Sequence, residues 1–245
     1  ALKTHKGICA TGKNGAYDDK MEKKTLLVKE PGFYRLMLML ALPVIIQNMI
    51  TVGVNIMDTV MLGSFGEIQL SGSSLANDFI NLFQIACMGV GGGASVLSAQ
   101  FYGKGDYNNV KKTVAIMLRV ILSVAVVCMV ISLFFPEELL RIYTADTAVI
   151  EKGAIYLRYS TASFVMMATT MTLTLILRSI HDVKIPLYTS IGSFFVNIFF
   201  NWVFIFGHFG VPQMQIAGAA IGTVLARLFE LIVIGGHFFF QEKQL

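Results

Sequence analysis

The sequence predicts an all-α integral membrane protein whose six transmembrane helices form one bundle. Of its 245 residues, 55% are hydrophobic and only 14% are charged, whereas about a quarter of the residues in a soluble domain carry a charge. Six apolar segments are each long enough to cross a bilayer, which takes roughly 20 residues. The breaks between them are short, polar and marked by Gly, Pro, Asn and Asp. No soluble domain therefore fits between the spans.

The elements begin with a polar, basic tail, residues 1–32, which lacks the apolar core of a signal peptide. Met21 opens a run typical of a bacterial cytoplasmic start, so we expect residues 1–20 to lie upstream of the native protein or to be foreign to it. Residues 33–240 form the predicted bundle, and 241–245 form a short end. The predicted spans are 33–62, 71–98, 113–135, 156–178, 186–206 and 213–240.

The orientation follows from Lys and Arg, which are retained on the cytoplasmic side of a membrane. The first and fifth breaks contain neither residue, and in the third break Arg141 and Lys152 are outnumbered by four acids. Both termini should therefore be cytoplasmic. The positive tail and breaks contain Lys23, Lys24, Lys29, Arg35, Lys104, Lys111, Lys112, Arg178, Lys184 and Lys243.

The net charge of +4 resides largely in the tail, so it indicates orientation and not a nucleic-acid partner. Cys9, Cys87 and Cys128 show no metal-ligand spacing, and neither a disulfide nor a cysteine metal site is expected. Neither His5 nor His237 has other metal-ligand residues near it, so no histidine metal site is expected. No cofactor is expected.

The first span carries a polar arc, because Gln47, Thr51, Asn55 and Asp58 fall on one side of a helical wheel. A carboxylate at membrane depth costs about 3 kcal/mol or more unless it finds partners, so such residues are usually functional. Asp58 is therefore the first candidate for a functional residue. Pro43 removes a backbone hydrogen bond from the same span and is expected to act as a hinge.

Three other spans carry polar side chains at a depth similar to that of Asp58, in the outer half of the membrane. They are Asn77, Asp78 and Asn81 of span two, Asn197 and Asn201 of span five, and Thr223 of span six. We expect these groups to surround one polar cavity with the arc of span one. The alternative is that Ser, Thr and Asn only hold helices together. Arg227 and Glu230, three residues apart on span six, can pair with each other.

Five motifs occur in order along residues 33–240: Pro43 with Asp58-Thr-Val-Met-Leu-Gly63; Gly92-Gly-Ala-Ser with Gln100-Phe-Tyr-Gly-Lys-Gly-Asp106; Arg178 to Pro186; Asn197 to Gly207; and Ile216-Ala-Gly-Ala-Ala-Ile-Gly-Thr223. Together they resemble the multidrug and toxic compound extrusion (MATE) transporters, particularly the bacterial and archaeal branches. The resemblance implies a twelve-helix exporter of drugs or organic cations, driven by Na⁺ or H⁺, of which this chain is one lobe.

The resemblance also implies that Asp58, Asn197 and Thr223 belong to the cation site of that lobe. Asn201 is the fourth residue predicted to bind the coupling cation; the family often has a second acid at this position, so the choice between Na⁺ and H⁺ stays open. The facing wall of the cleft is expected to come from a second bundle, either in a longer chain or in a second copy. Gln47, Thr51, Asn55, Asn77, Asp78 and Asn81 are the expected substrate-cavity residues.

Three other interpretations remain at this point. A lipid-linked oligosaccharide flippase of the same superfamily would be expected to carry more Arg and Lys in its lumen, for phosphates. An intramembrane aspartyl protease needs two carboxylates in one site, and Asp58 and Asp78 lack a loop motif to hold them together. A membrane scaffold without transport is the third. We favour a transporter and do not expect an enzyme.

Overall fold

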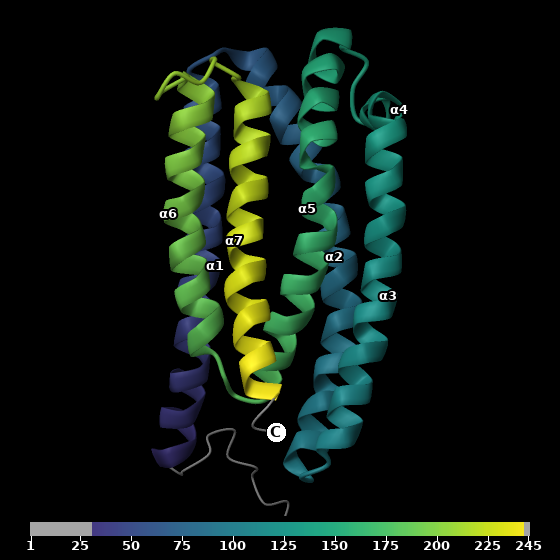
Figure 1. The fold of residues 1–245 in the computed structure, drawn as a ribbon, viewed down its shortest axis with the longest axis vertical. Coiled ribbons are helices and arrows are strands. Elements are labelled where there is room, and N and C mark those ends of the chain that lie inside the picture. Colours follow the sequence, from purple (N-terminus) through teal and green to yellow (C-terminus); the bar gives the residue numbers. More distant parts are fainter. Residues whose placement is uncertain (1–30, 243–245) are drawn as a thin grey trace, which may run out of the picture. The chain divides into compact units, whose positions relative to one another are not determined.

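The computed structural model describes residues 31–242, and in this part of the chain the secondary structure is helical. Six long helices and one short one follow each other (Figure 1). Their bounds are α1 Pro31–Gly63, α2 Glu67–Gly103, α3 Tyr107–Phe134, α4 Pro136–Arg141, α5 Thr147–Ser179, α6 Lys184–Phe206 and α7 Ile216–Glu242. Residues 38–242 belong to one compact unit.

Helix α5 is the centre of the compact unit, because it packs against α2, α3, α4 and α7. More than half of its most apolar stretch is buried, whereas the corresponding stretch of α1 contains no buried residue. Helices α6 and α7 run side by side (Figure 1). Helix α1 therefore lies at the edge of the bundle, where side chains rather than close backbone packing connect it to its neighbours.

Two features hold α2 against α5. The first is a pair of glycines: a Cβ on Gly72 would lie 2.9 Å from the backbone nitrogen of Gly153, and a Cβ on Gly153 would lie 2.9 Å from the Gly72 oxygen. The second is an aromatic cluster, in which the ring of Phe164 meets those of Phe79 and Phe83 edge-on at centroid distances of 5.9 and 5.2 Å. Backbone contact and ring packing thus fix the two helices that carry most of the core.

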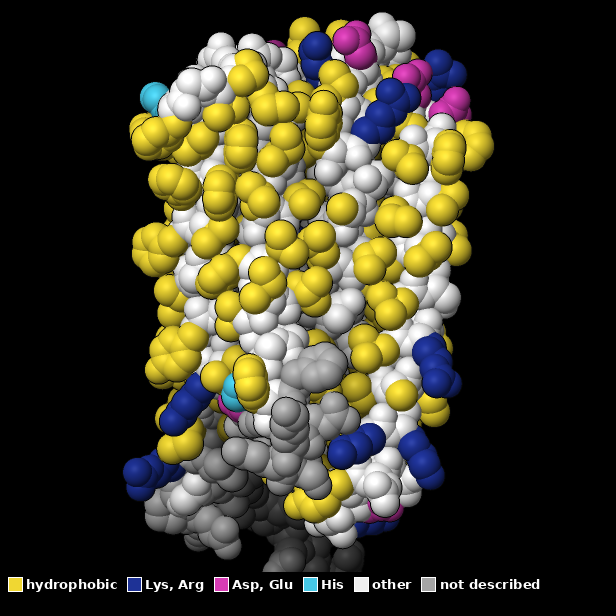
Figure 2. Space-filling view, viewed as in Figure 1, with side chains coloured by type: hydrophobic (Ala, Val, Ile, Leu, Met, Phe, Trp, Pro, Cys, Tyr) yellow, Lys and Arg dark blue, Asp and Glu magenta, His cyan; other side chains and the backbone are white. Residues whose placement is uncertain are grey.

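The prediction of six spans is confirmed, since six helices are long and apolar enough to cross a membrane. Apolar side chains cover the middle of the face in Figure 2, and charged side chains gather at its two ends. Several boundaries were wrong, most of all the start of the fourth span. Helix α5 begins at Thr147 instead of residue 156 because the carboxylate of Asp146 caps it, accepting from the Ala148 nitrogen at 2.9 Å.

Two further predictions need correction, and others concern residues outside those described. The third break contains the short helix α4, which begins with Pro136 in its first turn and ends at Arg141. Arg178, expected in the fourth break, lies in the last turn of α5. The predictions for residues 1–20, for the rest of the tail up to residue 30 and for Lys243 concern residues outside 31–242.

Candidate functional site

The carboxylate of Asp58 meets the side chain of Asn201, which is fully buried on α6. The Nδ2 of Asn201 donates to Asp58 Oδ1 at 2.6 Å and to the Oδ1 of Asn197, one turn earlier on α6, at 3.0 Å. Asn197 is 2% exposed and Asn201 0%. The structure thus brings together three of the four residues predicted to bind the coupling cation.

Helix α7 makes room for this cluster and for α6 at two of its glycines, Gly218 and Gly222. A Cβ on Gly222 would lie 2.0 Å from Asn201 Oδ1, and a Cβ on Gly218 would lie 2.6 Å from the carbonyl carbon of Phe204. The spacing of the two glycines, four residues apart, is the one that lets membrane helices approach closely. The position of the Asn201 amide therefore depends on Gly222.

Two oxygens near this cluster are buried without a hydrogen-bond partner among residues 31–242. They are Oδ1 of Asn201 and Oγ1 of Thr223. Thr223, the fourth predicted cation-site residue, lines a cavity of about 60 Å³ together with Asn197. A buried polar atom without a partner needs an explanation, such as a bound ion or water. Together with the Asp58 carboxylate these oxygens are of the type that hard cations prefer.

The predicted arc of α1 lines three cavities in succession. Gln47 and Thr51 line one of about 160 Å³, called the inner cavity, and Thr51 and Asn55 line the 60 Å³ cavity. Asn55 and Asp58 line one of about 190 Å³, called the outer cavity, nearest to the connection between α1 and α2. Neighbouring cavities thus share a residue of the arc. The wheel prediction that this arc faces a polar interior agrees with this arrangement.

The outer cavity lies between α1 and α2 and is lined mainly by polar side chains. Besides Asn55 and Asp58 it includes Asn77, Asp78 and Asn81, the three span-two residues predicted to line the substrate cavity. The hydroxyl of the buried Tyr156 on α5 donates to the Oδ1 of Asn77 at 3.3 Å. Asp78 and Asn81 are exposed. The two carboxylates share this cavity, but Asp58 bonds to Asn201 and not to Asp78.

The 160 Å³ cavity contains charged residues that sequence reasoning did not place in a site. Arg178, Arg227 and Glu230 all line it. Arg227 Nη1 donates to Glu230 Oε2 at 2.9 Å, as the spacing of three suggested. The pair therefore neutralises itself, and Arg178 adds one positive charge to the cavity wall. The sequence did contain a signal that could have placed Arg227 and Glu230 in a site. Both lie in the middle of an apolar span, where charged residues are usually functional.

A second group of polar contacts holds α1 to the bundle at Gln47. Its Nε2 donates to Ser190 Oγ at 2.8 Å and to the Pro186 carbonyl oxygen at 3.3 Å, and its Oε1 accepts from the guanidinium of Arg178. Pro43, the predicted hinge, lies one turn before Gln47, and α1 continues as a helix through it. Polar contacts thus fix α1 at two points, Gln47 and Asp58.

The sequence of the chain is similar to that of known proteins. Residues 43–203 match the profile of the MatE family. The chain belongs to that family. It is 27% identical over 208 residues to the "Probable multidrug resistance protein YoeA" of Bacillus subtilis, covering 84% of this chain and 44% of YoeA. A "Probable multidrug resistance protein NorM" of Thermotoga maritima is 27% identical over 209 residues, covering 83% of this chain and 44% of NorM.

Solved structures of MATE proteins share the fold. A crystal structure of MATE in the bent conformation superposes with a TM-score of 0.77 at 20% identity, covering 85% of this chain and 46% of that one. The structure of the MATE multidrug transporter DinF-BH gives a TM-score of 0.73 at 23% identity, covering 83% of this chain and 45% of that one. The MatE chain thus spans about half the length of these relatives. Its six long helices correspond to about half of a MATE transporter, and it is a multi-pass membrane protein whose relatives are transporters.

Proposed function

We propose that this chain forms one bundle of a cation-coupled antiporter that exports drugs or organic cations, with Asp58 as the coupling carboxylate. The observation that carries the proposal is the environment of Asp58. Its carboxylate faces a polar cavity on one side, and on the other side the buried amide of Asn201, whose own oxygen lacks a partner among the described residues. Multidrug relatives support export as the direction of transport.

Either coupling ion would act by neutralising Asp58. A proton would bind the carboxylate itself, and Na⁺ would be held by the carboxylate together with the oxygens of Asn201 and Thr223. Because position 201 carries an amide and not a second acid, one monovalent cation suffices for neutrality. A neutral site can be closed off from water, whereas an isolated buried charge is costly. The cation thereby binds the two states of the transporter with different affinity, which is what drives a conformational change.

The substrate would occupy the cavities along the arc of α1. Asn55, Asn77, Asp78 and Asn81 offer amide and carboxylate oxygens to a cation in the outer cavity. The inner cavity adds Gln47 and Thr51, together with the side chains of Met88 and Met171, whose flexible thioethers adapt to ligands of different shape. Because Arg178 adds a positive charge to the inner cavity, the cationic group would bind in the outer cavity, and the inner cavity would hold the apolar body of the substrate.

A cleft needs a facing wall, which we propose comes from a second bundle. The chain matches less than half of each relative, so the wall would belong to a longer chain or to a second copy. Expressed alone in an efflux-deficient host, residues 1–245 should leave dye accumulation unchanged. Export by this chain alone would show that two copies pair into a working transporter.

The test of the coupling role is the substitution Asp58→Asn in the complete transporter, reconstituted in liposomes. The variant keeps the size of the side chain but is permanently neutral, so export driven by a Na⁺ or proton gradient should be abolished. Leu62→Met, a volume-conserving change four residues further along α1, is the control and should retain export. Wild-type export by Asp58→Asn under both gradients would refute the proposal.

A further inference from the structure

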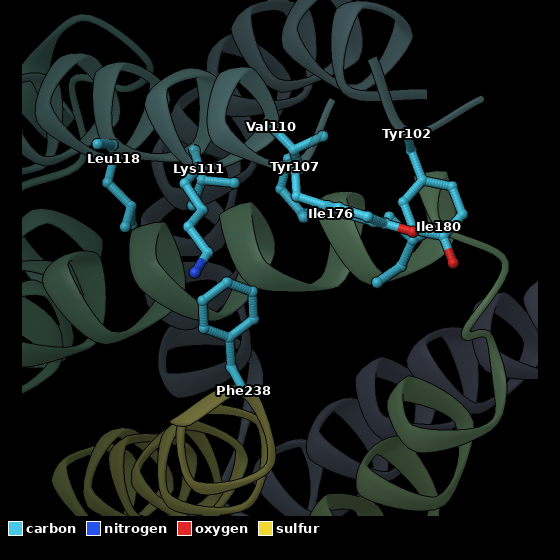
Figure 3. A pocket seen from close by; sticks show the side chains of 10 residues that line it. Tyr102, Tyr107, Val110, Lys111, Leu118, Ile176, Ile180 and Phe238 are labelled. Atoms are coloured by element: carbon cyan, nitrogen blue, oxygen red, sulfur yellow. The ribbon is translucent and has the colours of Figure 1, made fainter. Parts of the chain in front are cut away.

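A cavity of about 200 Å³ lies outside the polar site, at the end of the bundle where α2 and α7 end and α3 begins. Its wall is mostly apolar, with Leu118, Ile180 and Phe238 among the lining residues, but Tyr102, Tyr107 and Lys111 also line it. Figure 3 shows the Lys111 side chain extending from α3 toward Phe238 of α7, with Tyr102 and Tyr107 beside Ile180. One cation and two phenols thus border an apolar hollow.

The lining residues lie where the spans end. Tyr102 is next to the last residue of α2, Tyr107 is the first of α3, and Phe238 ends the apolar part of α7. Tyrosine is enriched at the two membrane–water interfaces, where its ring lies among lipid and its hydroxyl among polar groups. The rings of Tyr102 and Tyr107 meet edge-on at 5.9 Å. The cavity therefore opens at the level of the lipid headgroups.

The charged residues on the α2 and α3 side of the cavity are mainly lysines, and Asp182, near its α5 and α7 side, pairs with His237. Lys111 is exposed and forms no ion pair with any residue of 31–242. Lys104 lies in the connection between α2 and α3, and Lys112 lies in the second turn of α3; the only acid among residues 104–112 is Asp106. Both carboxylate oxygens of that acid already accept hydrogen bonds from Asn109, at 3.2 and 2.6 Å. The cation at the mouth of the cavity thus lacks a counter-ion among the described residues.

We propose that this cavity binds one anionic phospholipid of the adjacent leaflet. Its phosphate would contact the ammonium of Lys111 and the hydroxyls of Tyr102 and Tyr107, and the upper part of an acyl chain would lie against Leu118 and Phe238. Basic pockets between membrane helices bind anionic headgroups in this manner. By the distribution of Lys and Arg, the leaflet is the cytoplasmic one.

Lys112 offers a matched control, because it carries the same charge one residue further on but does not line the cavity. The chain is purified in detergent, and the affinities for dioleoyl phosphatidylglycerol and dioleoyl phosphatidylcholine are measured by native mass spectrometry. The wild type should prefer phosphatidylglycerol by about fivefold, the contribution of one lysine near anionic lipid. Lys111→Gln should abolish the preference, and Lys112→Gln should retain it. Equal losses in both variants would indicate a general basic surface and overturn the proposal.

A second pair of variants tests the apolar part of the site without changing charge. Ala115 lines the cavity and is exposed, so Ala115→Phe fills the space without disturbing the core, whereas Ile116, also exposed, lies outside the cavity. Ala115→Phe should remove the tightly bound lipid, and Ile116→Phe should not. Inorganic phosphate should not displace phosphatidylglycerol at millimolar concentration. Displacement by phosphate alone, or lipid retention by Ala115→Phe, would show that no lipid site exists here.

Discussion

The side chain of Asn201 connects two helices through one nitrogen, which lies 2.6 Å from Asp58 Oδ1 on α1 and 3.0 Å from Asn197 Oδ1 on α6. Helix α1 has little close backbone packing in the bundle. This hydrogen bond therefore contributes much of what attaches α1 to the other helices. The same nitrogen would lose its charged acceptor if a cation neutralised Asp58. Cation binding and the attachment of α1 are thus connected at a single side chain.

The fit of Asn201 against Gly222 predicts a position-specific loss of stability. In Gly222→Ala the new methyl group would lie 2.0 Å from Asn201 Oδ1, so the amide must move. Overpacking of this kind costs about 1–3 kcal/mol, which thermal unfolding in detergent would show as a lower Tm. Gly235→Ala on the same helix meets nothing within 4 Å and should keep the wild-type Tm. Equal values for the two variants would contradict the proposed contact.

Gln47 is predicted to hold the inner half of α1. Gln47→Ala removes its hydrogen bonds to Ser190, Pro186 and Arg178 and should destabilise the bundle by about 1 kcal/mol, because partly buried polar groups lose their partners. Hydrogen exchange of the α1 amides near Pro43 should become faster. Asn48→Ala changes an exposed neighbour and should leave the exchange unchanged. If both variants behave alike, Gln47 does not attach α1.

The topology predicts which positions an impermeant thiol reagent can reach. Single cysteines at Ser71 and Gln213, both exposed and next to the breaks that lack Lys and Arg, should react from outside intact cells. A cysteine at Asn108, in the first turn of α3 and close in sequence to Lys104, Lys111 and Lys112, should react only after permeabilisation. The native cysteines are replaced beforehand. The reverse pattern of labelling would contradict the orientation of the bundle.

The sequence was informative about the site wherever a pattern lies within one helix. The arc from Gln47 to Asp58 and the pair Asn197 and Asn201 are spaced by helical turns, so a wheel shows their faces. The fit of Asn201 to Gly222 joins two helices, and no single-helix pattern contains it. Arg178 was misplaced because a basic residue near a span end was read only as an orientation signal, although its guanidinium turns back to Gln47.

The fold was predicted well in number of spans and less well at their ends. Hydropathy locates the apolar middle of a span but not the polar turns that extend the helix at its ends. The start of α5, at Thr147, is such a polar turn. Local signals did exist there, since Asp146 caps α5 and Pro136 followed by two acids opens α4. Capping rules therefore define helix ends that hydropathy alone leaves out.

Asn201 is predicted to set the number of cations that the site binds. Asn201→Asp keeps the size of the side chain, so Gly222 still accommodates it, but it adds a second negative charge beside Asp58. Two like charges at this separation repel strongly, and neutrality then needs two monovalent cations. Binding of radiolabelled Na⁺ at alkaline pH should rise in stoichiometry relative to the wild type. The control Asn81→Asp adds the same charge at an exposed position and should not increase it, and an unchanged stoichiometry in Asn201→Asp would contradict the model of neutralisation.

Na⁺ and H⁺ coupling can be separated on the purified chain through the linkage between binding and stability. A ligand that binds only the folded state stabilises it by RT ln(1 + [L]/Kd), about 2.7 kcal/mol at a concentration of 100 Kd. If Asp58, Asn201 and Thr223 hold Na⁺, the Tm measured at alkaline pH should rise with Na⁺ concentration and not with choline at equal ionic strength. Asp58→Asn should remove this dependence because the amide supplies no balancing charge.

The matched control is Asp78→Asn, which removes a carboxylate from the same outer cavity at an exposed position and should retain the full Na⁺ dependence. If the wild type shows no Na⁺ dependence but its Tm varies with pH, and Asp58→Asn loses that variation, the coupling ion is the proton. A Na⁺ response that persists in Asp58→Asn would place the ion elsewhere. In that case the unpartnered oxygens of Asn201 and Thr223 would not be its ligands together with Asp58.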